Sequence, residues 1–169
     1  FRYERSIDKI RTMYLNDYYS KNNRDVKVIY LAGESGAGKT SFVYRNFDIT
    51  QIHRITDYDN PFDSYKGQKV LVMDEFHSQF AMSQMLNFLD IYPLELPARY
   101  NNKWACYDIV FILSNKPLEE QYMGIQEFQP ELWKAFRRRI TNHYWLQDND
   151  SSREEIYNSI KTDLIELPF

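Results

Sequence analysis

The sequence predicts an α/β domain with a central, mostly parallel five-stranded sheet and one added helix at each end. Three observations lead to this prediction: short apolar runs, segments of helical periodicity between them, and polar residues where the runs end. The chain has 169 residues, of which 43% are hydrophobic, so it can form one domain with a sizeable core. The apolar runs locate four of the five expected strands.

The N-terminal segment, residues 1–25, is predicted to be a helical extension that acts as a linker or in oligomerisation. Apolar side chains recur at helical spacing over residues 4–19, which indicates an amphipathic helix. A polar turn over residues 22–25 follows it. The apolar positions of this helix are Ile7, Ile10, Met13, Tyr14 and Tyr18.

The core is predicted to cover residues 26–147, with strands and helices in alternation. Nearly continuous apolar runs indicate a parallel sheet that is buried on both faces. The predicted strands cover residues 26–32, 69–73, 108–113 and 140–146, and the predicted helices follow the first strand and cover residues 80–89 and 130–138.

The C-terminal extension, residues 148–169, is predicted to contain a loop over residues 148–150 and a final helix to about Leu164. Ser151 and Glu154 have the spacing of a capping box, in which each side chain accepts a hydrogen bond from a backbone amide at the helix start. We therefore expect the helix to begin at about Ser151.

Composition and charge exclude several classes of protein. A net charge of -3, with 27% charged residues, is typical of a soluble globular protein and argues against a surface coated with basic residues. No apolar run approaches the roughly 20 residues that span a bilayer, and no signal-peptide pattern opens the chain. The single cysteine, Cys106, excludes an internal disulfide and a multi-cysteine zinc site, and we expect it to pack beside a strand. Because the chain begins at Phe1, we expect a fragment or a processed piece.

Residues 33–40, GESGAGKT, match the phosphate-binding pattern G-x-x-x-x-G-K-[ST] directly after the first predicted strand. The glycines let successive backbone N–H groups point at a phosphate at the positive end of the following helix. Lys39 is expected to reach the β- and γ-phosphates of ATP, and the Thr40 hydroxyl is expected to ligate Mg²⁺. The residues expected to bind the nucleotide are Gly33, Ser35, Gly36, Ala37, Gly38, Lys39, Thr40 and Ser41.

Polar residues end the next two apolar runs. Asp74 and Glu75 follow the second run, where Asp74 is expected to ligate Mg²⁺ and Glu75 to orient the attacking water. Taken alone, this pair is also typical of an acidic turn after a strand. Asn115 ends the third run at the same sheet edge and is expected to sense the γ-phosphate or to hold the water. A simple turn residue before Lys116 is the alternative.

Residues 96–104 combine two cations, two aromatic side chains and an Asn-Asn turn. Phosphate backbones attract cations and unstacked bases stack on aromatic rings, so the stretch suits single-stranded DNA. Arg99 and Lys103 are the expected DNA contacts. Tyr100 and Trp104 are further candidates, although either can pack on the core. An ordinary β-hairpin with a solvated tip is an equal alternative.

Arg137, Arg138 and Arg139 end the helix predicted over residues 130–138. Basic side chains at a helix C-terminus commonly compensate the helix dipole. The functional alternative is an arginine finger, which supplies positive charge to the γ-phosphate bound by a neighbouring subunit.

Three further segments carry a family resemblance. Residues 62–70 (FDSYKGQKV) lead into Asp74, residues 86–93 read LNFLDIYP, and residues 135–140 read AFRRRI. Together with the phosphate-binding loop, they resemble the superfamily 3 helicases, and most closely the helicase domain of rolling-circle replication initiators (Rep proteins). Such initiators occur in circular single-stranded DNA viruses and in related bacterial plasmids. The resemblance covers about residues 28–145.

The resemblance implies an AAA+-like P-loop NTPase fold and an enzyme that uses ATP and Mg²⁺ and assembles as a ring, with a hexamer expected. It also implies 3′-to-5′ unwinding, with single-stranded DNA in a central pore lined by residues 96–104. Arg138 or Arg139 takes the family position of the arginine finger, and the sequence does not separate the two. An endonuclease domain is expected in the full-length chain.

Two departures from the viral pattern favour a member from a bacterial plasmid or an integrated element. Residues 33–35 read GES where viral members commonly carry GPP, and residues 74–76 read DEF where they carry DDF. The expected compartment is the cytoplasm of a bacterial host, or the nucleus for a eukaryotic virus. His53, His77 and His143 lack the paired spacing of a nuclease metal site, so we expect no nicking activity in this segment.

The leading interpretation is an ATP-driven, ring-forming helicase that unwinds DNA during rolling-circle replication of a plasmid or virus. An RNA-directed superfamily 3 helicase is the closest alternative, because the hairpin sequence does not exclude RNA. A P-loop kinase is another, although such kinases usually carry an arginine-rich lid and lack an acidic residue like Glu75 paired with a strand-end asparagine. A non-catalytic module that binds ATP as an assembly switch is a third, and Glu75 argues against it.

Overall fold

Short apolar runs form the inner strands of the central sheet. The computed structural model describes residues 2–101 and 103–165, and the inner strands lie almost entirely buried between helices. They are β1 (Lys27–Gly33), β3 (Val70–Met73) and β6 (Ile109–Ser114), and β7 (Asn142–Leu146) lies at one edge. These four strands form where the apolar runs predict them.

The fifth strand, β2 (Ile52–Ile55), lies at the opposite edge, and the strand order is β2-β3-β6-β1-β7. Every neighbouring pair in this sheet is parallel, so the prediction of a mostly parallel five-stranded sheet is confirmed. The sequence did not locate β2 because His53 and Arg54 interrupt its apolar pattern. Arg54 is tolerated there because an edge strand leaves part of its side chain in solvent.

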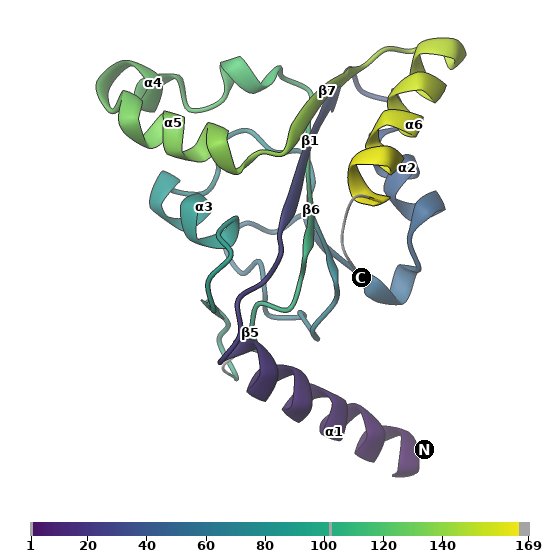
Figure 1. Ribbon diagram of the computed structural model, residues 1–169, viewed down its shortest axis with the longest axis vertical. Coiled ribbons are helices and arrows are strands. Elements are labelled where there is room, and N and C mark those ends of the chain that lie inside the picture. The colour runs from purple at the N-terminus through teal and green to yellow at the C-terminus, as the bar shows by residue number, and fades with distance from the viewer. Residues whose placement is uncertain (1, 102, 166–169) are drawn as a thin grey trace.

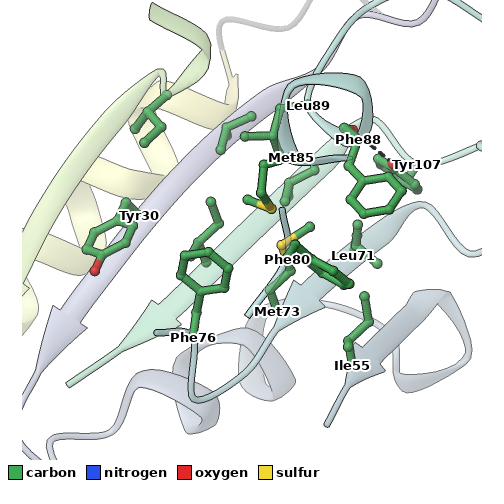
Figure 2. Close-up of a cluster of buried hydrophobic side chains, with 14 of the residues drawn as sticks. Tyr30, Ile55, Leu71, Met73, Phe76, Phe80, Met85, Phe88, Leu89 and Tyr107 are labelled. Carbon is green, nitrogen blue, oxygen red and sulfur yellow. Dashed lines mark hydrogen bonds between the residues drawn. The ribbon is translucent and has the colours of Figure 1, made fainter. Parts of the chain in front are cut away.

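Helices cover both faces of the sheet, as Figure 1 shows. α2 (Lys39–Asn46) and α6 (Asp150–Ile165) lie on one face, and α3 (Met82–Phe88), α4 (Met123–Phe128) and α5 (Pro130–Arg139) lie on the other. Successive strand side chains point to opposite faces, so Tyr30 joins the cluster under α3 and α5 while Ile29 joins the cluster under α2 and α6. Figure 2 shows the first cluster, in which the Phe80 and Phe88 rings meet edge to face at 5.1 Å.

The start of α6 differs from the prediction. The helix begins at Asp150, and Asn149 Oδ1 accepts a hydrogen bond from the Ser152 N–H at 2.9 Å. Asn149 therefore caps the helix, and the predicted Ser151–Glu154 capping box is wrong, as is the extension of the loop to Asp150. A helix begins after the residue whose side chain accepts a hydrogen bond from the unpaired backbone N–H groups of the first turn, and here that residue is Asn149.

Several short elements were not predicted from the sequence. They are α4, the 3-10 turns η1 (Ile49–Gln51) and η2 (Leu118–Glu120), and the antiparallel strands β4 (Glu95–Leu96) and β5 (Lys103–Trp104) as separate elements. Elements of two to six residues hold too few positions for a periodic pattern. None of the helices formed by residues 2–101 and 103–165 is long and apolar enough to cross a membrane.

α1 (Arg2–Tyr19) projects away from the rest of the fold (Figure 1). Its C-terminal end is attached by Leu15 and Tyr19, which pack against the core, and by Asn16, whose Oδ1 accepts a hydrogen bond from the Trp104 N–H at 3.4 Å. The apolar positions predicted from the periodicity are exposed, and they are Ile7, Ile10, Met13, Tyr14 and Tyr18. The helix therefore contacts the core only near its C-terminal end, and these five apolar side chains face solvent.

Gly33 lets the end of β1 approach the end of β7. A Cβ atom at Gly33 would stand 2.5 Å from the Leu146 carbonyl oxygen, closer than real Cβ contacts allow. The chain can leave the sheet into the phosphate-binding loop at this point because residue 33 has no side chain.

We expect Gly33→Ala to lower the free energy of unfolding by about 1–3 kcal/mol, because the added methyl group must push β1 and β7 apart. Gly36→Ala is the matched control, since nothing lies within 4 Å of its Cβ position and only its φ of 82° opposes a side chain. Urea denaturation of both variants measures the difference. A smaller loss for Gly33→Ala than for Gly36→Ala would contradict the close-approach explanation.

Candidate active site

The phosphate-binding loop joins β1 to α2 at the carboxyl end of the sheet. Gly38 is the N-cap residue of α2, with a φ of 96°, and no side chain caps the helix. The first N–H groups of α2 therefore remain available to a ligand at the loop. Ser35 and Gly36 are exposed, Ala37 is buried, and Thr40 and Ser41 belong to the first turn of α2. A glycine-rich loop at an uncapped helix N-terminus fits a phosphate group.

The Lys39 ammonium group lies inside the curve of this loop. Its Nζ donates to the carbonyl oxygens of Gly33 at 2.6 Å and Glu34 at 2.8 Å, and to Asn115 Oδ1 at 3.0 Å. Partial burial lowers the pKa of Lys39, and the nearby carboxylates of Asp74 and Glu75 oppose that shift. The fold thus brings together the lysine, the asparagine and the acidic pair that the sequence singled out.

Asp74 is buried at the end of β3 and is paired with Arg54 of β2. Arg54 Nε and Nη2 lie 2.7 and 2.5 Å from Asp74 Oδ2, and the Glu75 N–H donates to Oδ1 at 3.0 Å. The Tyr58 hydroxyl donates to the Asp74 carbonyl oxygen at 2.7 Å, and burial raises the pKa of that hydroxyl. Carboxylate and hydroxyl oxygens, here from Asp74 and Thr40, are ligands that Mg²⁺ prefers, so the donor set fits this ion.

Glu75 opens the tight turn that follows β3. Its φ is 49°, its side chain is exposed, and its carbonyl oxygen accepts a hydrogen bond from Gln79 Nε2 at 2.8 Å. A non-glycine residue in the left-handed backbone conformation lowers the stability of the fold by roughly 1–3 kcal/mol, and it persists only where the surrounding structure holds it. The exposed carboxylate is therefore held on a strained turn beside the loop lysine.

Gln121 is a buried residue of the site that the sequence did not reveal. Its side chain ties the turn after Glu75 to the strand end before Asn115. Gln121 Nε2 lies 2.9 Å from the Tyr30 hydroxyl, 3.2 Å from the Phe76 carbonyl oxygen and 3.0 Å from Ser114 Oγ, and its Oε1 accepts a hydrogen bond from Ser78 Oγ at 2.7 Å. No motif marks Gln121, because its partners lie on three different segments.

The strained backbone of the described chain is concentrated around this network. Glu75, Ser78 and Tyr122 are its non-glycine residues with positive φ, at 49°, 64° and 52°. Ser78 Oγ also accepts a hydrogen bond from the Tyr122 N–H at 2.9 Å, so two of the three are tied to each other. Gln121 contacts Ser78 directly and precedes Tyr122, which indicates that the network holds the turns in place.

The three arginines at the end of α5 have different surroundings. Arg139 Nη2 lies 2.9 Å from Asp90 Oδ2 in a half-buried ion pair, and Arg137 Nη2 lies 3.0 Å from His143 Nε2. Arg138 is exposed, and within residues 2–101 and 103–165 it makes no hydrogen bond or ion pair. Exposure therefore distinguishes Arg138 from Arg139, which the sequence did not separate.

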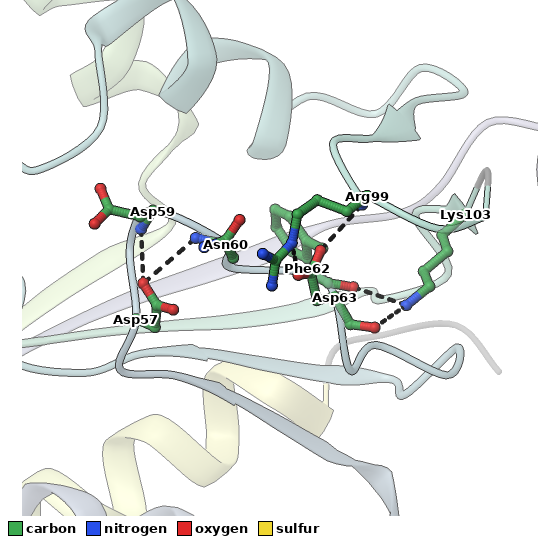
Figure 3. Close-up of polar contacts among 7 residues, drawn as sticks. All are labelled: Asp57, Asp59, Asn60, Phe62, Asp63, Arg99 and Lys103. Carbon is green, nitrogen blue, oxygen red and sulfur yellow. Dashed lines mark hydrogen bonds and ion pairs between the residues drawn. The ribbon is translucent and has the colours of Figure 1, made fainter.

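The predicted DNA contacts lie on the hairpin formed by β4 and β5. Arg99 is paired with Asp63, and Lys103 Nζ donates to the Phe62 carbonyl oxygen at 3.0 Å (Figure 3). Tyr100 is 79% exposed, whereas Trp104 is half-buried. The hairpin is therefore present, and both of its cations bind the segment that follows β2.

A phosphate-binding loop after β1, with acidic and amide residues at the ends of β3 and β6, defines a P-loop NTPase domain. The family model described as RNA helicase matches residues 29–116, which is just over half of the chain. The chain therefore belongs to this family of helicase domains, and the predicted resemblance to the superfamily 3 helicase domain of replication initiators is confirmed.

Several viral proteins are similar to the chain. Replication-associated proteins of Porcine circovirus 1, beak and feather disease virus and canary circovirus are 25%, 28% and 26% identical to it over 72–73% of its length. The chain covers only 38–41% of each of these proteins. Among solved structures, the S. cerevisiae Hsp104-ADP complex aligns with 95% of this chain and 36% of its own, with a TM-score of 0.48 and 17% identity.

We expect Gln121→Met to lower the free energy of unfolding by about 1–3 kcal/mol, because buried polar partners lose a hydrogen bond that no water replaces. Gln129→Met is the matched control. Because Gln129 is exposed, this substitution is expected to change the free energy of unfolding by no more than about 0.5 kcal/mol. Urea denaturation of both variants measures the effect. Equal stability of the two variants would contradict the network's role.

Proposed function

We propose that the chain is an ATP-dependent, ring-forming DNA helicase that unwinds DNA during replication of a virus or plasmid. One observation carries the proposal: Lys39 Nζ and Asn115 Oδ1 lie 3.0 Å apart, beside the carboxylates of Asp74 and Glu75. An ammonium group, an amide and two carboxylates at one sheet edge are the groups that ATP hydrolysis uses. The replication-associated proteins among its relatives support the replication role.

In the proposed mechanism, Lys39 exchanges the carbonyl oxygens of Gly33 and Glu34 for the β- and γ-phosphates of ATP. Glu75 accepts a hydrogen bond from the attacking water and orients it, and Asn115 holds that water or the γ-phosphate through its amide. Thr40 and Asp74 would hold Mg²⁺, which supplies charge neutralisation at the phosphate oxygens when bound.

Single-stranded DNA in a central pore is the proposed partner, with Arg99, Lys103, Tyr100 and Trp104 of the hairpin as its contacts. The exposed Tyr100 ring lies 5.5 Å from the Arg99 guanidinium carbon, so a stacking surface and a cation are adjacent. RNA is the second candidate substrate, favoured by the description of the matching family. Strand displacement measured on matched DNA and RNA duplexes decides between them.

Ring formation is supported by the exposed apolar residues of α1 and by the exposed Arg138. We propose residues 1–25 as the linker or oligomerisation segment, 26–147 as the ATPase core and 148–169 as an extension, with a hexamer as the expected assembly. Because the relatives are longer than the chain, an additional endonuclease domain is part of the proposal for the whole protein. The proposed compartment is the bacterial cytoplasm, or the nucleus for a eukaryotic virus.

We expect Lys39→Ala to abolish ATP binding, because the ammonium group is the main counter-charge to the β- and γ-phosphates. Glu75→Gln should bind ATP normally and fail to hydrolyse it, since only the orientation of water is lost. Fluorescent-nucleotide titration and phosphate release measure the two steps. Unchanged nucleotide affinity in Lys39→Ala would reject the phosphate-binding loop as the site, and normal turnover in Glu75→Gln would reject Glu75 as the catalytic carboxylate.

We propose Arg138 as the arginine finger, and we expect Arg138→Ala to retain ATP binding and lose hydrolysis by about 10³-fold or more. Arg139→Ala should instead mainly lower the melting temperature, because it breaks the ion pair with Asp90. Mixing Arg138→Ala with Glu75→Gln subunits should restore activity where an intact Glu75 site meets an intact arginine. Full turnover in Arg138→Ala, or loss without rescue on mixing, contradicts a finger that acts between subunits.

A further inference from the structure

The two hydrogen bonds between Arg99 and Asp63 have the form of an anion-binding site. The Arg99 backbone N–H donates to Asp63 Oδ1 at 3.1 Å, and Arg99 Nε donates to Asp63 Oδ2 at 2.6 Å. Two donors of one residue thus bind both oxygens of one carboxylate. Paired, charge-assisted contacts of this kind recognise carboxylates and phosphates alike, because both present two charged oxygens side by side.

Asp63 is held in this position as a charged group. Its pKa is lowered, first by the hydrogen bond from the Arg99 N–H and further by the Arg99 and Lys103 charges. The Asp63 side chain is 19% exposed, whereas that of Arg99 is 59% exposed. Water and solutes therefore reach the cation more freely than the carboxylate that neutralises it.

The second cation of the hairpin has a different role. Lys103 Nζ binds the backbone carbonyl oxygens of Phe62 and Asp63 and leaves the Asp63 carboxylate to Arg99 (Figure 3). Lys103 thus fixes the hairpin to the segment after β2 through the main chain. Removal of the Asp63 charge would leave this attachment intact.

We propose that the Asp63 carboxylate occupies the position of a phosphodiester group on the hairpin, and that a phosphate of a bound single strand replaces it at Arg99. This inference rests on the proposed function, in which the hairpin binds single-stranded nucleic acid. Tyr100, 79% exposed beside the Arg99 guanidinium group, provides the adjacent surface for a base. Asp63 then lowers the affinity for the strand, because binding must first break its contact with Arg99.

The test compares two variants that remove one negative charge from the same loop. Asp63→Asn keeps the shape of the side chain and removes its charge at Arg99. Asp59→Asn is the matched control, because Asp59 is exposed, belongs to the same loop and lies away from Arg99 (Figure 3). If the variants bind the strand better only because the loop repels its phosphates less, both variants gain affinity. If Asp63 competes with the strand phosphate for Arg99, only Asp63→Asn gains affinity.

Affinity is measured by fluorescence anisotropy with labelled oligothymidylate and oligouridylate, in the presence of Mg²⁺ and a non-hydrolysable ATP analogue. We expect Asp63→Asn to bind both strands about twofold to fivefold more tightly than the unmodified chain, the range typical of a partly exposed ion pair. Asp59→Asn should bind as the unmodified chain does. Asp63→Ala serves as a second variant if Asp63→Asn folds poorly, and melting temperatures verify the fold of each.

A third comparison links the effect to Arg99. Asp63→Asn combined with Arg99→Ala should bind no more tightly than Arg99→Ala alone. A gain that persists without Arg99, a gain equal to that of Asp59→Asn, or weaker binding by Asp63→Asn each overturns the proposal while the hairpin remains a nucleic-acid site. If the unmodified chain binds neither strand, or binds as well with Arg99 and Lys103 both changed to alanine, the proposed nucleic-acid function fails and this inference fails with it.

Discussion

The parallel register of β6 with its two neighbours, β1 and β3, is the constraint on which the site depends. Ala32 of β1 pairs with Ser114 of β6, and Met73 of β3 pairs with Ile112 of β6, so the carboxyl ends of the inner strands lie at one edge. Asp74 and Asn115 directly follow β3 and β6. A shift of either strand by a single residue would turn its side chains to the other face. In this register, Lys39 Nζ and Asn115 Oδ1 lie 3.0 Å apart.

The parts of the fold and the site that could be predicted are those with local patterns. The inner strands follow from their apolar runs, and the loop lysine, Asp74, Glu75 and Asn115 follow from motifs directly after those strands. Arg54 could not be predicted, because its partner Asp74 lies on another strand and its own strand shows no apolar run. Gln121 could not be predicted for the same reason, since its partners come from three segments that only the folded sheet brings together.

The hairpin could be predicted from the sequence only in part. A hairpin rich in cations and aromatic rings was readable from residues 96–104, but the pairing of Arg99 with Asp63 joins residues 36 positions apart and has no local signal. Residues 54–63, which run from β2 into the loop after it, form a segment that contacts both regions, through Arg54 and Tyr58 at Asp74 and through Asp63 at Arg99. This segment is a physical connection between the acidic pair and the hairpin, and energetic coupling through it requires two distinct arrangements of the segment.

The order in which the strands occur along the chain also has a kinetic consequence. β1 is made first, yet it lies between β6 and β7, and its Val28 N–H is hydrogen-bonded to Thr141 Oγ1, 113 residues later. Contacts between such distant residues form slowly, because a long loop must close before any pairing compensates the lost entropy. Gly33 can therefore pair with Leu146 only after most of the chain has been synthesised, and the loop that follows β1 adopts its final conformation only then. During translation, the apolar β1 segment remains without its strand partners for that whole interval, and an unpaired apolar strand of this kind is prone to aggregate.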